Sequence, residues 1–519
     1  MRDASGQQDA AQRRAAQQAE NAQVWQTRAE ERAKRIERVV AERDRLKTLS
    51  GWLRARIGRT VNPPQARPVT APSPAAVEAK PPPRAMAFPT VRVATLVTDP
   101  LVSTVLDETN VVRLSEDPAA FDAADLVVVE GEALASSNDS FRNRFDEWVG
   151  SLARAPLVLI EGDQGAVPLR DGDVAARRSW VEGGEAAAWP LPPTFDAARF
   201  NPRLDFDRAD FVQRTGIAVS QSEDGQRFDA GQPWMLAAAA TGHPFPGVVD
   251  GDDASRKGVA VRRVTFRDNA PWIVASRLLD RAGVGHEPPL PTVAGILLSM
   301  RPERVPEAVR RFAAQTYPRT ELVVGCHRFS ADAIAGVVRE VEGSLPIRVM
   351  EFDESFSLGR CLNAAIEATP ASLIAKIDDD DFYGPNYLED AVQANRYAGA
   401  PLVGKGATFT YLENRGETLL RRPDIVDRFY DGSPSGASLV FERSVWERIP
   451  FPHRTLGEDL AFVEAAKRLG IRPYATSPYE FVYYRGIAGN TWAAVDEVFL
   501  EGAVPAWPGN RPEMAIIDA

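Results

Sequence analysis

The chain has 519 residues, more than one ordinary domain holds, so two or three domains are expected. The formal net charge of −11 argues against a general nucleic-acid-binding protein, whose binding face would be basic, and 44% hydrophobic residues are enough for real cores. The two cysteines, Cys326 and Cys361, suit a reducing compartment and no disulfide framework. The sequence has no signal core and no window approaching about 18 apolar residues, so we expect a cytoplasmic protein with no transmembrane segment.

Residues 1–60 predict a long helix, because Asp9 to Ile57 contains no proline and is rich in Ala, Gln, Glu and Arg. Apolar residues recur there at alternating three- and four-residue steps, as in a coiled-coil seam, although Arg32 and Arg43 interrupt the seam. We expect oligomerisation or partner docking through this coiled coil, and a partly disordered charged helix is the alternative. Residues 61–90 are rich in Pro and Ala and predict a semi-extended linker.

Residues 91–288 predict a Rossmann-like α/β domain. Strand-like apolar runs alternate there with segments of helical potential, which is typical of a mostly parallel sheet with helices on both faces. The strands are expected at Val91–Val97, Asp125–Glu130 and Pro156–Glu161, and the helices at Ser140–Leu152 and Ala270–Arg281.

Parts of this middle region resemble GT-B glycosyltransferases. Trp189–Pro202 resembles their inter-lobe segment, and Trp234–Pro246 resembles the helix and turn that follow their donor-binding acidic motif. The closing helix Trp272–Ala282 fits the same scheme. The region has no Glu-x7-Glu donor motif and no Arg/Lys pair to grip a phosphate, so we interpret it as a degenerate module, with a second active site as the alternative.

The C-terminal region is organised around the stretch Ser372–Pro385. A short apolar run there predicts a buried strand that ends on four consecutive carboxylates, Asp378 to Asp381, before the helical segment Asn386–Tyr397. Ligands of open α/β sheets bind beyond the carboxyl ends of the strands, and adjacent carboxylates repel one another unless a cation lies among them. The pattern favours a divalent-metal site that holds a phosphorylated ligand. A solvated acidic turn or a helix N-terminal charge cluster is the alternative.

The same region repeats a strand–helix pattern, with strands expected at Val293–Ser299, Glu321–Gly325 and Ile347–Phe352. The series closely resembles family 2 glycosyltransferases with the GT-A fold. The matching pieces, in order, are the opening strand, Gln315–Pro318, Leu358–Asn363, the Asp-x-Asp strand, Ser435–Trp446 and Gly457–Asp459. The expected fold class is therefore α/β: residues 289–519 form a GT-A domain (Rossmann-like nucleotide-diphospho-sugar transferase), preceded by the Rossmann-like domain and the helical coiled coil.

The resemblance implies a Mn²⁺ or Mg²⁺ ion at the acidic strand end, where it neutralises the charge that develops on the diphosphate leaving group. Asp380 is then the first candidate ligand. Asp378 would lie nearer the ribose or nucleotide and is also a candidate ligand, and Asp381 could bind metal or orient the other carboxylates. Asp379 is expected to act as spacing, and the individual assignment among the four stays open.

The resemblance also implies donor-binding residues. These are Ser299, Arg301, Gly359, Asn363 and Arg485, together with Asp378. Relatives often supply a late histidine to the metal or diphosphate. Here that stretch holds Asn490, which binds metal more weakly, while Arg485 could pair with the diphosphate instead.

An acceptor hydroxyl is a poor nucleophile and needs a general base within hydrogen-bond reach. The resemblance gives this role to Asp459, with Glu458 beside it. The alternative is a carboxylate that the helix dipole favours at a helix N-terminus. Direct in-line attack assisted by one base implies inversion at the sugar C1.

Two function classes follow from these patterns. The leading hypothesis is a metal-dependent, inverting glycosyltransferase that moves a single sugar from a nucleotide-sugar donor to an unknown hydroxyl acceptor, a cell-envelope glycan or a metabolite. Single transfer is favoured because the chain lacks the Gln-x-x-Arg-Trp motif of processive synthases. The rival is a non-catalytic coiled-coil scaffold with a degenerate sugar-nucleotide or glycan-binding module. The clustered like charges favour the enzyme, since a scaffold has no reason to keep them.

Overall fold

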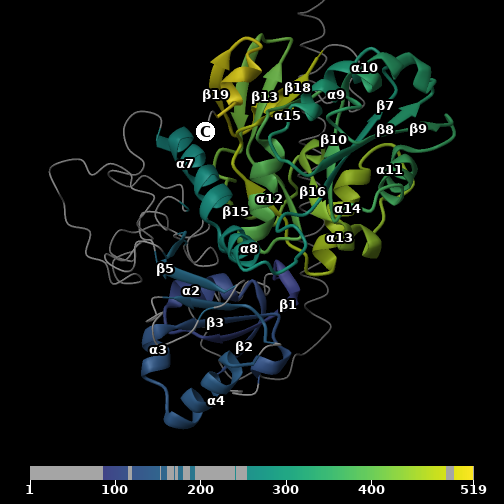
Figure 1. Ribbon diagram of the computed structural model, residues 1–519. Helices are drawn as coiled ribbons and strands as arrows, with labels where there is room; N and C mark the ends of the chain where they lie inside the picture. Colours follow the sequence, from purple (N-terminus) through teal and green to yellow (C-terminus); the bar gives the residue numbers. More distant parts are fainter. Residues whose placement is uncertain are drawn as a thin grey trace, which may run out of the picture. The chain divides into compact units, whose positions relative to one another are not determined.

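The computed structural model describes most of residues 86–517, and this part belongs to one compact unit of the chain, Lys80–Ala519. The expected coiled coil and nearly all of the linker lie outside the described residues, as does Trp234–Pro246 apart from Ala240. Figure 1 shows the arrangement of the described elements. The internal segments left out of the description are 115–119, 152–153, 161–168, 170–172, 179–187, 193, 195–239, 241–253 and 487–495.

The first sheet is six-stranded, in the order β2-β1-β3-β4-β5-β6, and every neighbouring pair is parallel. The three strands that the sequence predicts are confirmed as β1, β3 and β4, and the two predicted helices as α4 and α8. The sequence patterns did not predict β2, β5 or β6. The bounds are β1 (Phe88–Leu96), β2 (Thr109–Arg113), β3 (Leu126–Glu130), β4 (Leu157–Ile160), β5 (Val174–Arg178), β6 (Trp189–Leu191), α2 (Pro100–Leu106), α3 (Gly131–Ala135), α4 (Asp139–Val149) and α8 (Pro271–Arg281).

The second sheet is eight-stranded, in the order β15-β17-β12-β16-β10-β7-β8-β9. The neighbours β10, β7, β8 and β9 are parallel, whereas β16 runs antiparallel between β10 and β12. The predicted strands β7, β9 and β10 are confirmed with the expected bounds, and β8 with slightly wider ones. The strands are β7 (Val293–Ser299), β8 (Thr320–His327), β9 (Ile347–Phe352), β10 (Leu373–Ile377), β12 (Leu402–Lys405), β15 (Arg428–Phe429), β16 (Val440–Glu442) and β17 (Tyr474–Thr476).

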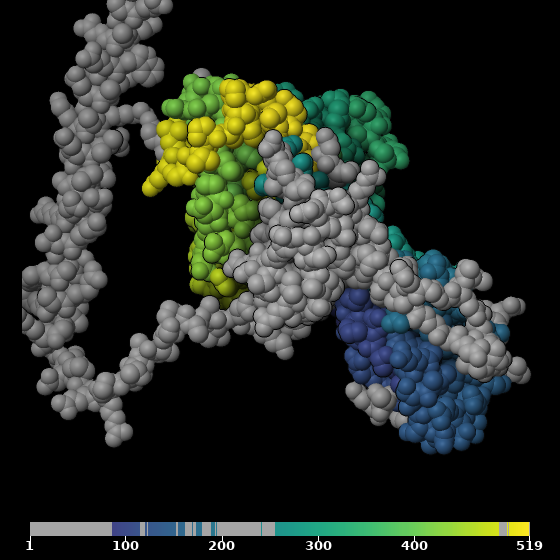
Figure 2. Space-filling view, turned by 90° about the vertical axis from the view of Figure 1, so that its left-hand side faces the viewer, coloured from purple at the N-terminus to yellow at the C-terminus, as the bar shows by residue number. Residues whose placement is uncertain are grey.

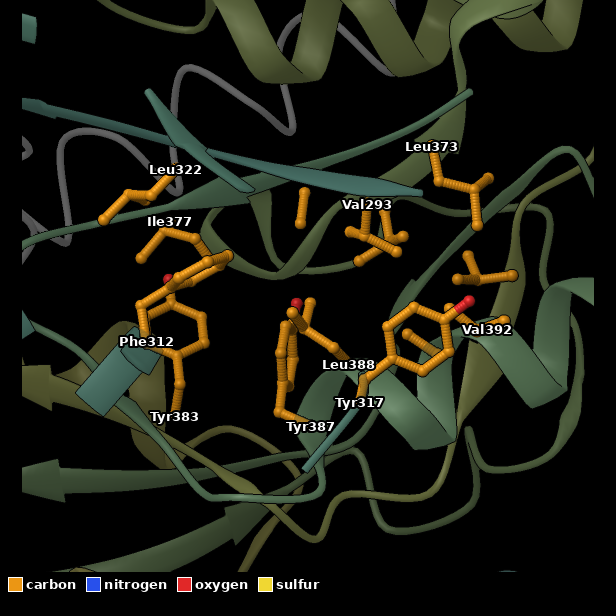
Figure 3. Close-up of a cluster of buried hydrophobic side chains, with 14 of the residues drawn as sticks. Val293, Phe312, Tyr317, Leu322, Leu373, Ile377, Tyr383, Tyr387, Leu388 and Val392 are labelled. Carbon is orange, nitrogen blue, oxygen red and sulfur yellow. The ribbon is translucent and has the colours of Figure 1, made fainter. Parts of the chain in front are cut away.

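Helices cover both faces of this sheet, because its central strands are buried on both sides. On one face Val293 and Leu297 share a cluster with α9, α10 and α12, and on the other Ala294 and Ile296 share one with α11, α13 and α14. Figure 3 shows the first cluster, where Tyr383 and Tyr387 lie beside Phe312. The helices are α9 (Val305–Ala313), α10 (Ala335–Val341), α11 (Leu358–Glu367), α12 (Tyr387–Ala398), α13 (Arg443–Arg448) and α14 (Glu458–Arg468).

A third, five-stranded sheet has the order β11-β18-β13-β14-β19 and was not predicted. Its first strand, β11, directly follows the four aspartates, so this sheet begins at the acidic segment. The strands are β11 (Phe382–Tyr383), β13 (Thr408–Leu412), β14 (Glu417–Arg421), β18 (Phe481–Arg485) and β19 (Ala503–Pro508). In Figure 2 the C-terminal residues, in yellow, form one continuous surface with the green strands, as the β14–β19 pairing requires.

A buried ionic network joins α7 (Ala254–Asn269) to the C-terminal domain. The Arg263 guanidinium lies 2.7 Å from Asp390 and 2.9 Å from Glu480, and it donates to the Ile517 carbonyl at 2.7 Å. Removing one member of such a network leaves the others charged and buried, which is strongly destabilising. The network therefore fixes α7, α12, the start of β18 and the last described residues against one another.

Within the described residues, none of the helices combines the length and apolar character that crossing a bilayer would need. Both cysteines are free and buried.

Candidate active site

The four aspartates begin where β10 leaves the sheet, so they lie at the edge where the parallel strands β7, β8 and β9 also end. Tyr383 fixes the first of them: its hydroxyl accepts a hydrogen bond from the Asp378 backbone N–H at 2.9 Å and donates to the Ala437 carbonyl at 2.6 Å. One buried phenol thus joins the acidic segment to a turn more than fifty residues later in the chain. The sequence reasoning did not single out Tyr383.

Asp378, Asp380 and Asp381 bring one carboxylate oxygen each to within 4.8 Å of one another, an arrangement that could hold a metal ion. Burial, followed by repulsion from Asp378, raises the pKa of Asp380, and burial with repulsion from Asp380 and Asp378 raises that of Asp381 well above its usual value. Asp381 accepts the Tyr484 N–H at 2.9 Å through Oδ1, while its buried Oδ2 has no hydrogen-bond partner among the described residues. A divalent cation is the group that would satisfy this donor set.

Asp379 points to two residues that the sequence assigned to donor binding. Ser299 donates to its carboxylate, and the Arg301 guanidinium forms an ion pair with it and lies 3.0 Å from Asp380. These contacts hold Asp379 in place, and its spacing role stays a prediction. A direct donor contact of Ser299 or Arg301 stays a prediction.

Lys376 places a cation inside β10, two residues before Asp378. Its side chain is buried and its Nζ lies 2.6 Å from Asp378 Oδ1. Burial lowers the pKa of a lysine, but Asp378, Asp459 and Glu458 outweigh that effect and raise the pKa of Lys376. The sequence patterns did not single out Lys376.

Glu458 and Asp459 open α14, and Asp459 lies against Gly436, next to the Ala437 carbonyl that Tyr383 connects to Asp378. The Asp459 carboxylate lies over Gly436: a methyl group built on that glycine would come 1.5 Å from Asp459 Oδ2. Asp459 Oδ1 accepts the Leu460 N–H at 2.6 Å. Burial, opposed by Lys376 and reinforced by Asp459, raises the pKa of Glu458 to about 7.

Gly359 and Asn363 contact a different segment. A methyl group on Gly359 would lie 1.9 Å from the Pro452 carbonyl oxygen, and Asn363 accepts from the Trp446 indole and exchanges hydrogen bonds with the Phe451 backbone. Both residues thereby fix α11 against the segment that leads to Glu458. This gives the motif a packing role, and donor binding by the pair stays a prediction.

Arg485 ends β18, next to Tyr484, whose N–H binds Asp381. Its guanidinium is buried and stacks 4.6 Å from the Tyr483 ring and 4.8 Å from the Phe499 ring. The alternative Asn490 lies outside the described residues. Lys405 is buried and donates to the carbonyls of Ser477 and Tyr479 at 2.8 Å, so it supports the fold.

Residues 299–423 match the model of glycosyl transferase family 2. The resemblance of the C-terminal region to family 2 glycosyltransferases is thereby confirmed, and the GT-B resemblance of the middle region stays a prediction.

Three known proteins match parts of the chain. The amylovoran biosynthesis glycosyltransferase AmsE of Erwinia amylovora is 22% identical over 123 residues, which are 24% of this chain and 46% of AmsE. The mannosyltransferase PcManGT of Pyrobaculum calidifontis, solved with GDP-Man and Mn²⁺, is 18% identical, with 39% of this chain and 59% of that chain covered and a TM-score of 0.33. S. aureus TarS 1–349 with UDP-GlcNAc is 17% identical, with coverages of 40% and 64% and a TM-score of 0.33. The chain thus spans less than two thirds of each of these relatives.

Proposed function

We propose that this protein is a metal-dependent, inverting glycosyltransferase of the GT-A type that moves a single sugar from a nucleotide-sugar donor to a hydroxyl acceptor. The acceptor class that we propose is a cell-envelope glycan or a metabolite. The observation that carries the proposal is that two carboxylate groups, Asp378–Asp381 and Glu458–Asp459, come together. Tyr383 joins the first group to the turn at Gly436, against which Asp459 lies, and carboxylates of both groups act on the buried Lys376.

Asp380, Asp378 and Asp381 are the residues that would hold a Mn²⁺ or Mg²⁺ ion. Their clustered oxygens and the buried, unpaired Oδ2 of Asp381 fit such an ion, because hard divalent cations prefer carboxylate oxygens. When bound, the ion acts as a Lewis acid that neutralises charge on the leaving diphosphate. Arg485 would pair with the same diphosphate.

Asp459 would take the proton from the acceptor hydroxyl. Its carboxylate lies against the backbone of Gly436, which the Ser435–Ser438 turn and Tyr383 connect to the acidic segment. The base is therefore held at a defined place relative to the metal-binding carboxylates. Attack from the side of this base, opposite the departing diphosphate, inverts the configuration at C1.

Donor binding is tested by a thermal-shift panel of nucleotide sugars, including GDP-mannose and UDP-N-acetylglucosamine, with and without Mn²⁺. A ligand that binds only the native state raises the apparent melting temperature by mass action. We expect a shift that needs both the metal and one donor and that Asp380→Ala abolishes. Asp332→Ala, at an exposed aspartate after β8, is the matched control and should keep the shift.

Catalysis by Asp459 is tested with the donor that this panel identifies. Asp459→Asn should leave the shift intact while kcat falls by about 10²- to 10⁴-fold, the usual contribution of a general base. Equal loss of donor binding in both variants would show that Asp459 is not the base. A folded wild-type chain that responds to no donor in the presence of Mn²⁺ would instead favour the non-catalytic scaffold.

A further inference from the structure

Lys376 lies on the face of β10 that α14 covers. The neighbouring Ile374, which has the same orientation on the strand, shares a hydrophobic cluster with Phe462 of α14, and α14 begins at Glu458. The backbone N–H of Lys376 donates to the Leu439 carbonyl at 2.9 Å, so the strand also lies beside the turn that contains Gly436. Lys376 is therefore enclosed by the elements that carry Asp459 and Glu458 on one side and Asp378 on the other.

A comparison within the chain shows that burial alone does not account for this cation. Lys405 is 2% exposed, bonds to two carbonyls, and burial lowers its pKa to about 8. Lys376 is 5% exposed, yet its pKa moves in the opposite direction, because Asp378, Asp459 and Glu458 together outweigh the cost of burial. Lys376 forms an ion pair with Asp378 and lies on the face of β10 that α14 covers, so we assign this charge to the site itself.

We propose that Lys376 is a positioning residue that separates the metal-binding carboxylates from the Glu458–Asp459 pair and keeps that pair from becoming additional metal ligands. This inference rests on the proposed function. Carboxylates are the oxygen ligands that a hard divalent cation prefers, so a base placed close to the metal cluster would be captured by the ion unless another cation stood between them. The ammonium group of Lys376 holds Asp378 by an ion pair and attracts the other two carboxylates electrostatically.

Removal of this cation has two opposite consequences. A divalent ion loses the repulsion of a nearby positive charge and gains access to further carboxylates, so it binds more tightly. The base loses the partner that holds it near its working position, so catalysis slows. If Lys376 had only a structural role, its removal would weaken both divalent-ion binding and catalysis.

The test compares Mn²⁺ affinity, from the electron paramagnetic resonance signal of free Mn²⁺, in four full-length chains: wild type, Lys376→Met, Lys376→Arg and Lys467→Met. We expect Lys376→Met to lower the Mn²⁺ Kd on the order of tenfold, the effect of removing one charge near a divalent ion at partly screened distances. Lys376→Arg keeps the charge and should stay within about twofold of wild type. Lys467→Met removes the same charge on the solvent side of α14, where Lys467 pairs with Glu464, and should leave the Kd unchanged.

Equal or weaker Mn²⁺ binding by Lys376→Met would overturn the inference. If circular dichroism shows that Lys376→Met does not fold, the Mn²⁺ Kd of Lys376→Gln is measured instead and judged by the same criterion. The kinetic arm uses the donor found by the thermal-shift panel, and kcat should fall at least tenfold in Lys376→Met and recover in Lys376→Arg. A wild-type chain that binds no Mn²⁺ overturns both proposals. A wild-type chain that binds Mn²⁺ but responds to no nucleotide sugar overturns the proposed function alone, because the Mn²⁺ comparison still decides the role of Lys376.

Discussion

Substitution of Gly436 by alanine tests whether the position of Asp459 limits catalysis. The added methyl group would lie 1.5 Å from Oδ2 and 2.4 Å from Cγ of Asp459. Non-bonded carbon and oxygen atoms need about 3.5 Å, so the carboxylate has to move by about 2 Å. A misplacement of about 1 Å can cost about 10²-fold in rate, and a general base contributes ~10²–10⁴-fold, so we expect kcat to fall by about 10²- to 10³-fold.

Stability should change little, because the displaced atoms are the far end of a side chain at the start of a helix. We expect the free energy of unfolding to change by less than about 1 kcal/mol, as for most substitutions outside a core. The assay measures release of nucleoside diphosphate from the donor, alongside urea unfolding. Gly336→Ala is the matched control, since a methyl group there has no atom within 4 Å. A Gly436→Ala enzyme that is as stable and as fast as wild type would refute the assignment of Asp459 as a positioned base.

Two further substitutions test the surroundings of the base. Tyr383→Phe removes the hydroxyl that joins the Asp378 N–H to the Ala437 carbonyl. Because both groups then lose their partner, the free energy of unfolding in urea should fall by about 1–3 kcal/mol, and kcat should fall as well. Unchanged stability would contradict a structural role of these two hydrogen bonds. Glu458→Gln tests a pH effect. The folded-state pKa of Glu458 is raised from 4.5 to about 7, so the folded chain binds the extra proton and wild type loses stability as pH rises through this window. Gln cannot titrate. As the pH rises from 4.5 to about 7, the unfolding free energy of wild type, compared with that of Glu458→Gln, should therefore fall by up to about 3 kcal/mol. Screening by solvent makes this fall smaller. A difference that does not vary with pH would refute the raised pKa.

The central strands could be predicted from the sequence because burial on both faces leaves a continuous apolar run. Val293–Ser299 coincides with β7 for this reason, and the run Leu373–Ile377 coincides with β10. The predicted strand Ile347–Phe352 coincides with β9, but β9 lies at the edge of the sheet and is only partly buried. Leu358, Leu362 and Ile366 recur every four residues, a spacing that indicates one apolar helix face, and Leu362 and Ile366 are buried where α11 packs on the sheet. Such local patterns record burial directly, so they could be read without any knowledge of long-range contacts.

The third sheet could not be predicted because its strands lack such a pattern. β11 is two residues long, and β19, Ala503–Pro508, contains two prolines and is mostly exposed. These strands exist through pairing with partners far away in the chain, such as β11 with β18 and β14 with β19. Pairings of this kind depend on the tertiary fold and leave little trace in composition.

The same distinction applies to the candidate site. Its carboxylates could be identified because acidic residues clustered after a buried strand are unusual. The residues that connect them could not, since Tyr383 reads as one more aromatic residue and Gly436 as one more turn glycine. Their importance lies in the atoms they meet, the Ala437 carbonyl and the Asp459 carboxylate, which only the fold brings together.

The charge distribution of the site connects the two proposals. Six carboxyl groups belong to the candidate site, Asp378 to Asp381 with Glu458 and Asp459, and Lys376 and Arg301 are two basic side chains that form ion pairs with its aspartates. Each cation occupies a distinct place: Arg301 holds Asp379 and Asp380, and Lys376 holds Asp378 and faces the base. The shifted pKa values of Asp380, Asp381 and Glu458 show that these two cations do not offset the remaining repulsion and burial. A divalent ion would relieve the repulsion among the aspartates. The charge of Lys376 would then keep Asp459 from becoming a further ligand of that ion.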